Sequence, residues 1–293
     1  MFRYIQLSVV AVAMLVAAAG QAEADHLGSA NPVYISSLGN GEPWGEDVNI
    51  TLMDEIFGTG GWDHLYFEWF PEGGAGPVPH EVPFIFIEGS DMGANQLEGF
   101  LGDNITALED WVIDGGNLFI NAAPNEGDGM SFGFGGVNLE YDGTTSSEEV
   151  VSVAPMHPIF NGPFPTIGEG DILEGDSFGH GLIADGGEQG TIIESLIADI
   201  SGTGPDDRVV LAEFHAPELD GIGRVIFGGM TMPTFHDPED AAWGLRANII
   251  AYTAGVEPVG PVVPEPSSLA LFGIGALGLG FYARRRKQES ATA

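Results

Sequence analysis

The sequence predicts an α/β protein built around a mostly parallel β-sheet. Residues 83–87 are apolar throughout, which is typical of a strand that is buried on both faces of a parallel sheet. Residues 95–114 carry apolar side chains at helical spacing, although the Gly-Asp-Asn at 102–104 offers a point where this helix breaks in two. Residues 117–121 then read as the next strand. Strand, helix and strand in this order predict a βαβ unit with parallel strands.

Three elements are expected before this unit. Residues 33–38 are rich in β-formers and lead into a glycine-containing loop, which predicts a strand. Residues 48–57 place apolar side chains on one helical face, and Gly58 provides a stop. Residues 65–67 form a plausible second strand.

The second half of the chain is less regular. Residues 124–190 are rich in glycine and acidic residues and predict short strands and long loops. Residues 208–214 and 224–227 read as two strands in a hairpin-like arrangement. Asp237 is expected to cap a final helix, with a proline at its first position, that stops near Gly255.

The charge of the chain is strongly unbalanced, with 8 Lys and Arg against 43 Asp and Glu and a formal net charge of −35. Between positions 25 and 263 there are 40 acidic residues and three arginines, which gives this part a net charge of −37. Such a surface repels phosphate backbones and excludes nucleic acid as a partner. The chain has no cysteine, which excludes disulfides, thiolate metal sites and cysteine nucleophiles.

The N-terminus has the pattern of a secretory signal peptide. Arg3 precedes an apolar run at 7–19, and Ala22-Glu23-Ala24 supplies a small-x-small cleavage site. We therefore expect residues 1–24 to be removed by signal peptidase after Ala24. Residues 25–255 are then expected to form one α/β domain.

The C-terminus reads as a spacer followed by a short membrane anchor. Residues 256–263 form a proline-rich linker, and residues 267–283 carry no charge. As a helix, this apolar stretch is roughly 25 Å long, which is marginal for a bilayer core of about 30 Å. The cations that follow it are expected to stay in the cytoplasm, so that the body lies outside the inner membrane.

This tail resembles a known sorting signal. Its three parts are the triplet Pro264-Glu265-Pro266, the apolar helix, and a basic end with Arg284, Arg285 and Arg286. Residues 264–287 thus resemble the PEP-CTERM sorting signal of Gram-negative bacteria, and residues 288–293 form a tail beyond it. The resemblance implies transient anchoring in the inner membrane, processing by an exosortase, and final placement at the cell surface or in the extracellular matrix.

The body resembles class I glutamine amidotransferase-like domains, and within them the trehalose-utilisation-like branch. The similar segments are 112–120 (VIDGGNLFI), 156–162 (MHPIFNG), 223–229 (GRVIFGG) and 246–252 (RANIIAY). The resemblance spans roughly residues 31–255. It implies a flavodoxin-like fold, with helices on both faces of the sheet and a site at the carboxyl ends of the central strands.

The sequence departs from this family at the nucleophile. Amidotransferases of this fold carry a cysteine on the turn after the strand that residues 118–121 resemble, whereas this chain has Ala122-Ala123-Pro124 there. Without the thiolate the covalent mechanism cannot run, so glutaminase chemistry is excluded. We therefore expect no enzymatic activity of this kind and no cofactor.

Polar residues near the strand ends and near the last helix are the candidate ligand-binding groups. Carboxylates, amides and hydroxyls in this position can bind sugar hydroxyls or a cation. Metal binding stays open: Glu213 and His215 share one face of a strand, and the loop at 125–128 offers oxygen ligands without matching the calcium-loop pattern. The candidate residues are Glu88, Ser90, Asp91, Asn121, Asp128, His236 and Asp237.

Three classes of function remain open. The first, which we favour, is an exported non-catalytic protein of the cell surface or matrix that binds extracellular polysaccharide. The second is an exported hydrolase that uses carboxylates and histidines of the strand-end crevice. The third is a calcium-dependent structural module. A carboxylate beside His236 in one pocket would favour the hydrolase, and clustered carboxylates without histidine would favour calcium.

Overall fold

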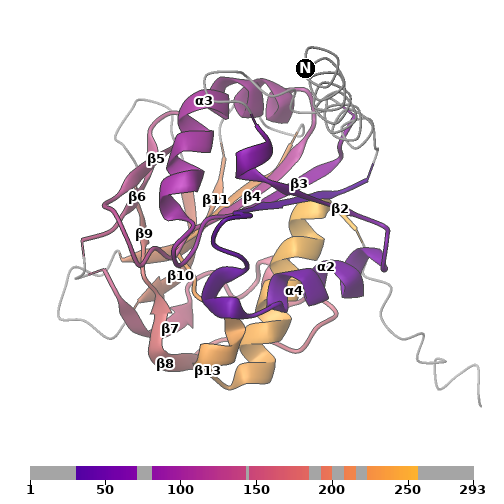
Figure 1. Cartoon of the computed structure of the whole chain (residues 1–293). Helices are drawn as coiled ribbons and strands as arrows, with labels where there is room; N and C mark the ends of the chain where they lie inside the picture. Colours follow the sequence, from indigo (N-terminus) through magenta and orange to yellow (C-terminus); the bar gives the residue numbers. More distant parts are fainter. Residues whose placement is uncertain are drawn as a thin grey trace, which may run out of the picture. The chain divides into compact units, whose positions relative to one another are not determined.

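The computed structural model describes residues 31–70, 81–142, 145–184, 193–199, 208–215 and 223–256 (Figure 1). These residues all belong to one unit, Met1–Pro258. The predicted signal peptide, the linker beyond Val256, the sorting segment with its apolar helix, and the tail lie outside the described residues. The predicted domain boundaries stay predictions.

The main sheet has ten strands in the order β13-β8-β7-β10-β11-β12-β4-β3-β1-β2. Five neighbouring strands pair in parallel: β2 (Asp63–Tyr66), β1 (Val33–Ser36), β3 (Phe84–Glu88), β4 (Asn117–Asn121) and β12 (Val225–Gly228). The sheet continues beyond β12 with antiparallel pairs: β11 (Val209–Phe214), β10 (Ile193–Asp199), β7 (Ser147–Ser152), β8 (Ile172–Gly179) and β13 (His236–Asp237). β12 is therefore the strand that joins the two halves.

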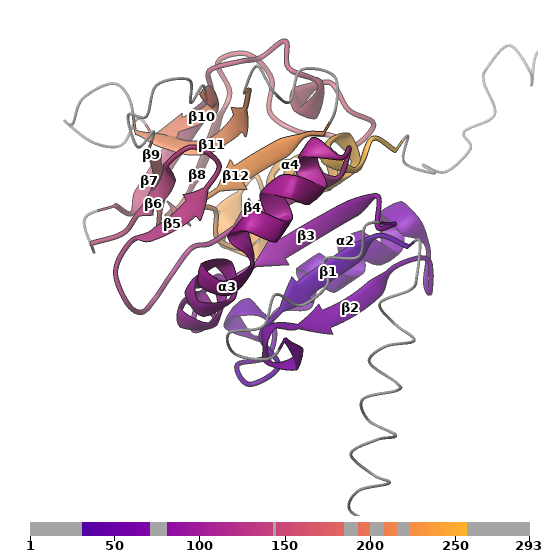
Figure 2. The ribbon, with the colours of Figure 1, turned by 90° about the horizontal axis from the view of Figure 1, so that it is seen from above.

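A second, antiparallel sheet of three strands and three α-helices complete the described part of the chain. The small sheet has the order β5-β6-β9, and Figure 2 shows it beside α3. Its strands are β5 (Met130–Gly133), β6 (Val137–Glu140) and β9 (Leu182–Ala184). The α-helices are α2 (Val48–Phe57), α3 (Ala94–Ile113) and α4 (Glu239–Ala254), and the 3₁₀ turns are η1 (Pro43–Gly45), η2 (Phe67–Trp69), η3 (Pro158–Phe160) and η5 (Pro233–Phe235).

The predicted fold class is wrong. The structure is mostly β, and its main sheet is mixed rather than mostly parallel: of the nine strand pairings described in it, five are antiparallel. It is therefore not a helix-flanked, flavodoxin-like parallel sheet. The prediction rested on the βαβ unit, whereas the segment expected to hold short strands and loops supplies β5 to β9, which enlarge the sheet and build the second one.

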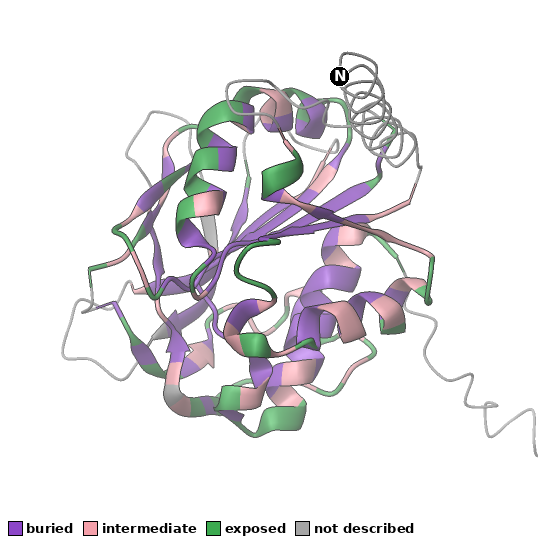
Figure 3. Cartoon of the chain, in the orientation of Figure 1, coloured by how far each residue is buried: buried purple, intermediate pink, exposed green. Residues whose placement is uncertain are grey.

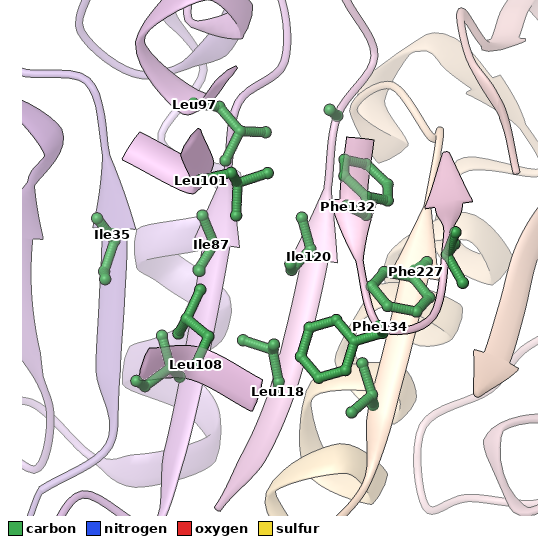
Figure 4. Packing of buried hydrophobic residues seen from close by; sticks show 14 of the residues in the cluster. Ile35, Ile87, Leu97, Leu101, Leu108, Leu118, Ile120, Phe132, Phe134 and Phe227 are labelled. Carbon is green, nitrogen blue, oxygen red and sulfur yellow. The ribbon is translucent and has the colours of Figure 1, made fainter. Parts of the chain in front are cut away.

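Local predictions around the βαβ unit are confirmed. All five residues of β3 are buried, and its four apolar side chains alternate between two hydrophobic clusters. Ile85 and Ile87 belong to the cluster that contains apolar side chains of α3 and of the small sheet, and Figure 4 shows Ile87 near Leu101 of α3. Phe84 and Phe86 belong to the other cluster, with apolar side chains of α2 and α4. Figure 3 shows the same distribution, with buried positions on the central strands and exposed ones on the outer sides of α3.

Glycine positions in the helices lead to a first testable prediction. The expected break at 102–104 is absent, since α3 runs unbroken from Ala94 to Ile113. A Cβ added at Gly102 would meet nothing within 4 Å, so Gly102→Ala should raise the free energy of unfolding by about 0.5–1 kcal/mol. A Cβ at Gly244 of α4 would lie 1.7 Å from the Pro165 carbonyl oxygen, so Gly244→Ala should lower the free energy of unfolding by about 1–3 kcal/mol. Urea denaturation of both variants measures these changes, and equal effects would contradict the prediction.

The start of the last helix differs from its predicted cap. Asp237 belongs to β13, and Pro238 occupies the N-cap position without a capping side-chain hydrogen bond. Glu239 and Asp240 lie in the first turn, where their charges favour the positive end of the helix dipole. The end near Gly255 is confirmed, because Gly255 adopts the left-handed conformation as the C-cap.

Candidate functional site

Three of the candidate residues lie together in a buried polar network at the carboxyl ends of β3 and β4. Glu88 ends β3 and is 1% exposed. Asn121 ends β4 in the paired register, and its Nδ2 donates to both carboxylate oxygens of Glu88 at 3.1 Å. The backbone N–H of Ser90 donates to Glu88 Oε1 at 2.9 Å, and the Ser90 hydroxyl donates to the same oxygen. The parallel pairing thus brings these three groups together.

A buried arginine from α4 completes this network. Arg246 is 2% exposed, and its Nη1 lies 3.1 Å from Glu88 Oε2. Its Nη2 donates to the carbonyl oxygens of Thr231 at 2.8 Å and of Met230 at 3.4 Å. Asn49 of α2 donates from Nδ2 to Glu88 Oε2 at 3.2 Å. Burial lowers the pKa of Arg246, and the adjacent Glu88 carboxylate opposes that effect.

The Glu88 network fixes the ends of the strands. Glu88 accepts hydrogen bonds from β4, α2, α4 and its own strand-end turn, so a buried charge is compensated from four directions. The Ser90 hydroxyl also accepts from the backbone N–H of Ala123 at 2.9 Å, which ties the two loops together. Ala122, which directly follows β4, is fully buried next to this tie. The ligand-binding role of these residues stays a prediction.

A cleft of about 480 Å³ opens beside the network. Trp44, from the loop after β1, meets Phe235 with ring centroids 5.5 Å apart and His180 with centroids 5.9 Å apart, both nearly perpendicular. Hydroxyl groups line the rest of the cleft. The lining residues are Trp44, Ser177, His180, Thr231, Thr234 and Phe235.

Backbone strain marks one wall of the cleft. Trp44 and Asp91 both have positive φ angles, of 53° and 55°. The Trp44 backbone N–H donates to Asp91 Oδ2 at 3.0 Å, and Asn125 Nδ2 donates to Asp91 Oδ1 at 2.8 Å. Left-handed conformations of bulky residues are costly and gather at functional sites. The candidate Asp91 therefore holds the turn that carries Trp44.

His180 lines the cleft and His236 lies behind it, and burial favours the neutral form of both side chains. His180 Nδ1 donates to the Pro124 carbonyl oxygen at 3.1 Å, and burial lowers its pKa. His236 lies behind the cleft, with Nε2 2.9 Å from the hydroxyl oxygen of Thr231. Burial, and secondarily the charge of Arg246, lower the pKa of His236 to about 4. The candidate His236 is thus linked to the Glu88 network through Thr231.

The remaining two candidates lie elsewhere. Asp128 is exposed on the loop that precedes β5. Asp237 is exposed on β13, where its backbone pairs with Glu174. Neither is joined to the Glu88 network by a described hydrogen bond or ion pair.

The predicted metal-binding pair forms part of a separate hydrogen-bonded cluster. Glu213 Oε2 lies 2.8 Å from His157 Nε2 and 3.5 Å from His215 Nε2, and Tyr252 donates to Glu213 Oε1 at 3.0 Å. Across the described ranges, no group of three or more His, Asp or Glu side chains has a geometry that could hold a metal ion.

Comparison with known proteins identifies the tail. Residues 262–287 match the PEP-CTERM protein-sorting motif. This sorting motif confirms the predicted signal, and it indicates an exported protein that an exosortase sorts and that is anchored in the membrane transiently before it is associated with the surface. No curated protein matches the chain, and the match to the sorting motif lends no support to the amidotransferase-like resemblance of the body. Within the part that the structure describes, no helix combines the length and the apolar character needed to cross a membrane.

Sequence reasoning missed two parts of the site. It did not assign Arg246 to Glu88, although a signal was present: Arg246 is one of three cations in an acidic body and stands in an apolar helical stretch. A cation in such a position must have a buried anion, and Glu88 directly follows the most apolar strand. It also did not connect Trp44 with Phe235, because no periodic pattern relates two loops that are far apart in the sequence.

Proposed function

We propose that this is an exported, non-catalytic protein of the bacterial cell surface or extracellular matrix, whose strand-end cleft binds a neutral polysaccharide. The sorting motif supports this location. We propose in addition that the exosortase processing takes place in a Gram-negative bacterium. The observation that carries the binding role is the cleft with the aromatic side chains of Trp44, Phe235 and His180 and with hydroxyl groups between them.

The lining of the cleft suits a sugar ring. Phe235 is 40% exposed and stands nearly perpendicular to Trp44, so the two rings form a corner with an open apolar face. Apolar faces of pyranose rings pack on such surfaces, while the Ser177 hydroxyl offers a donor and an acceptor for a sugar hydroxyl.

The negative charge of the body limits the kinds of polysaccharide that the cleft can bind. The body carries a net charge of −37 between positions 25 and 263. Uronic acids, sulfated sugars and phosphorylated polymers would be repelled by this field. Neutral polysaccharide is the extracellular polymer that fits both the charge and the aromatic corner.

The positions and hydrogen bonds of the nearby carboxylates support a protein that binds polysaccharide without hydrolysing it. Hydrolysis of a glycosidic bond ordinarily needs two carboxyl groups that flank the bond. The cleft is lined by no Asp or Glu among the described residues, and the adjacent Asp91 carboxylate binds the Trp44 backbone and Asn125. A hydrolase would require the Asp91 carboxylate to be released from its hydrogen bonds with the Trp44 backbone and Asn125.

The binding proposal predicts the behaviour of two cleft variants. In affinity electrophoresis through gels that contain laminarin, dextran or galactomannan, the protein should be retarded by at least one polymer. Phe235→Ala and Trp44→Ala should each abolish the retardation, because each removes one wall of the aromatic corner. Trp69→Ala is the matched control, since Trp69 is similarly exposed, at 38%, but does not line the cleft.

Two outcomes would contradict this proposal. Unchanged retardation of folded Phe235→Ala would show that the cleft does not bind the polymer. Release of reducing sugar during the incubation would overturn the non-catalytic role.

A further inference from the structure

The carboxyl group of Glu42 lies in a buried polar cluster beside the cleft. Its side chain is 13% exposed and is enclosed by β1 and β2. Tyr34 donates its hydroxyl to Glu42 Oε2 at 2.7 Å, and Ser36 donates to Oε1 at 3.3 Å. His64 Nε2 lies 3.6 Å from Oε1 and 2.8 Å from the Ser36 hydroxyl oxygen. The protein thus holds this carboxyl group away from solvent.

The charged and titratable groups around Glu42 oppose its ionisation. Burial is the largest effect, and the carboxylates of Glu88 from β3 and Asp47 before α2 add to it, so the pKa of Glu42 rises to about 7. The hydrogen bond from Tyr34 acts in the opposite direction and favours the ionised form. The guanidinium of Arg246 on α4 pairs with Glu88 rather than with Glu42.

The histidine beside Glu42 does not neutralise it. Burial lowers the pKa of His64 to about 4. Between pH 4 and pH 7 both side chains are therefore neutral, and their contact at 3.6 Å is not an ion pair. Tyr66 also lies on β2, and burial and Glu42 raise the pKa of its phenol, so it stays protonated near neutral pH.

A short, constrained turn connects Glu42 to the cleft. Glu42 precedes η1, and its carbonyl oxygen accepts a hydrogen bond from the Gly45 N–H at 2.9 Å. Only Pro43 separates Glu42 from Trp44, which forms one wall of the cleft in a strained conformation tied to Asp91. A rigid proline and a strained residue leave the turn little freedom to absorb a displacement of Glu42.

We propose that Glu42 is a proton switch that sets the position of the Trp44 wall and thereby makes ligand binding in the cleft depend on pH. The ligand part of this statement rests on the proposed function. With Glu42 protonated, its side chain stays in the cluster and the wall is formed. On ionisation, repulsion by Glu88 and the gain in hydration draw the carboxylate outward, and the turn with Trp44 follows.

The size of the effect follows from the fraction of protonated Glu42. With a midpoint near pH 7, that fraction falls about tenfold between pH 6 and pH 8. If the protonated form alone has a complete cleft, the apparent affinity falls by the same factor, about tenfold.

Fluorine NMR of the full chain labelled with 5-fluorotryptophan tests the switch without any ligand. The Trp44 resonance, assigned by its loss in Trp44→Phe, should move between pH 5.5 and pH 8.5 with a midpoint near 7. In Glu42→Gln it should remain at its acidic position throughout. Glu46→Gln is the matched control, because it removes an equal charge from the residue after η1 and should leave the titration as in the wild type.

A second variant keeps the test decisive if Glu42→Gln fails to fold. Tyr34→Phe removes a hydrogen bond that favours the ionised carboxylate, so the Trp44 midpoint should move to higher pH. A Trp44 resonance that does not change with pH, or one that titrates unchanged in Glu42→Gln or Tyr34→Phe, would overturn the proposal.

Binding of laminarin at pH 6 and pH 8 separates the two proposals. If Trp44 titrates and laminarin, dextran and galactomannan all fail to bind, the switch stands and the proposed function fails. If a polymer binds equally at both pH values and Phe235→Ala abolishes that binding, the cleft binds carbohydrate and the switch is refuted.

Discussion

Replacement of Arg246 by methionine is expected to lower the free energy of unfolding by about 3–5 kcal/mol. The substitution removes the cation that lies 3.1 Å from Glu88 Oε2 in a site where Glu88 is 1% exposed. The remaining carboxylate would be buried without a counter-charge, and the carbonyl oxygens of Met230 and Thr231 would each lose a donor. Urea denaturation monitored by circular dichroism measures the loss.

A double variant and a matched control show whether the unpaired charge is the cause. Arg246→Met combined with Glu88→Gln should recover part of the loss, since no isolated charge is left in the core. Arg208→Met removes a cation from a site that is not fully buried, where the effect should stay below about 1 kcal/mol. Equal stability of Arg246→Met and the wild type would show that the pair contributes nothing.

Replacement of Asn121 by aspartate is expected to cost about 3 kcal/mol at pH 8. The change is nearly isosteric, but it turns a donor that lies 3.1 Å from both Glu88 oxygens into a second carboxylate. Repulsion would raise the pKa of the new carboxyl group above its value in the unfolded chain. The folded state would then bind more protons than the unfolded state, so the variant should recover stability as the pH falls from 8 to 5.

Asn125→Asp is the control for this variant. Asn125 donates to the Asp91 carboxylate at 2.8 Å, as Asn121 does to Glu88, but it is exposed to solvent. Water screens the new repulsion there, and the loss should be below about 1 kcal/mol. Urea denaturation of both variants at pH 5 and pH 8 provides the comparison, and a loss for Asn121→Asp that does not depend on pH would contradict the repulsion mechanism.

The elements that the sequence predicts well are those whose burial is visible in a short window. The first four positions of β3 are apolar, and α3 repeats its apolar side chains at helical spacing, so each element can be recognised without knowledge of its partners. β7 (SEEVVS) and β8 (ILEGDSFG) contain charged residues or glycine and carry no such pattern. They form strands because they pair with each other, and because β7 also pairs with β10 and β8 with β13; a short window cannot show such contacts between distant segments.

The residues of the candidate site also divide into those that a short stretch of sequence predicts and those that depend on distant contacts. Glu88, Ser90 and Asn121 could be placed together because they end adjacent strands of one predicted unit. Their partner Arg246 lies 158 positions after Glu88, and only packing of α4 against the sheet brings it there. The aromatic corner joins Trp44 and Phe235 from two loops in the same way, which is why neither its shape nor its volume could be predicted.

β12 joins the parallel and antiparallel halves of the main sheet, and its late place in the sequence affects the order in which the protein folds during export. Residues 225–228 pair with residues 118–121, so the two halves of the sheet can be joined only after more than a hundred residues between the strands have crossed the membrane. Such distant pairing makes folding slow, and the chain emerges with Glu88 still lacking its counter-charge. That charge arrives with α4, which ends at Ala254, and only residues 255–261 separate it from the sorting motif. The last segment needed to complete the body is therefore delivered just before the segment that is held in the membrane, which allows folding to finish on the outer side while the tail is still retained.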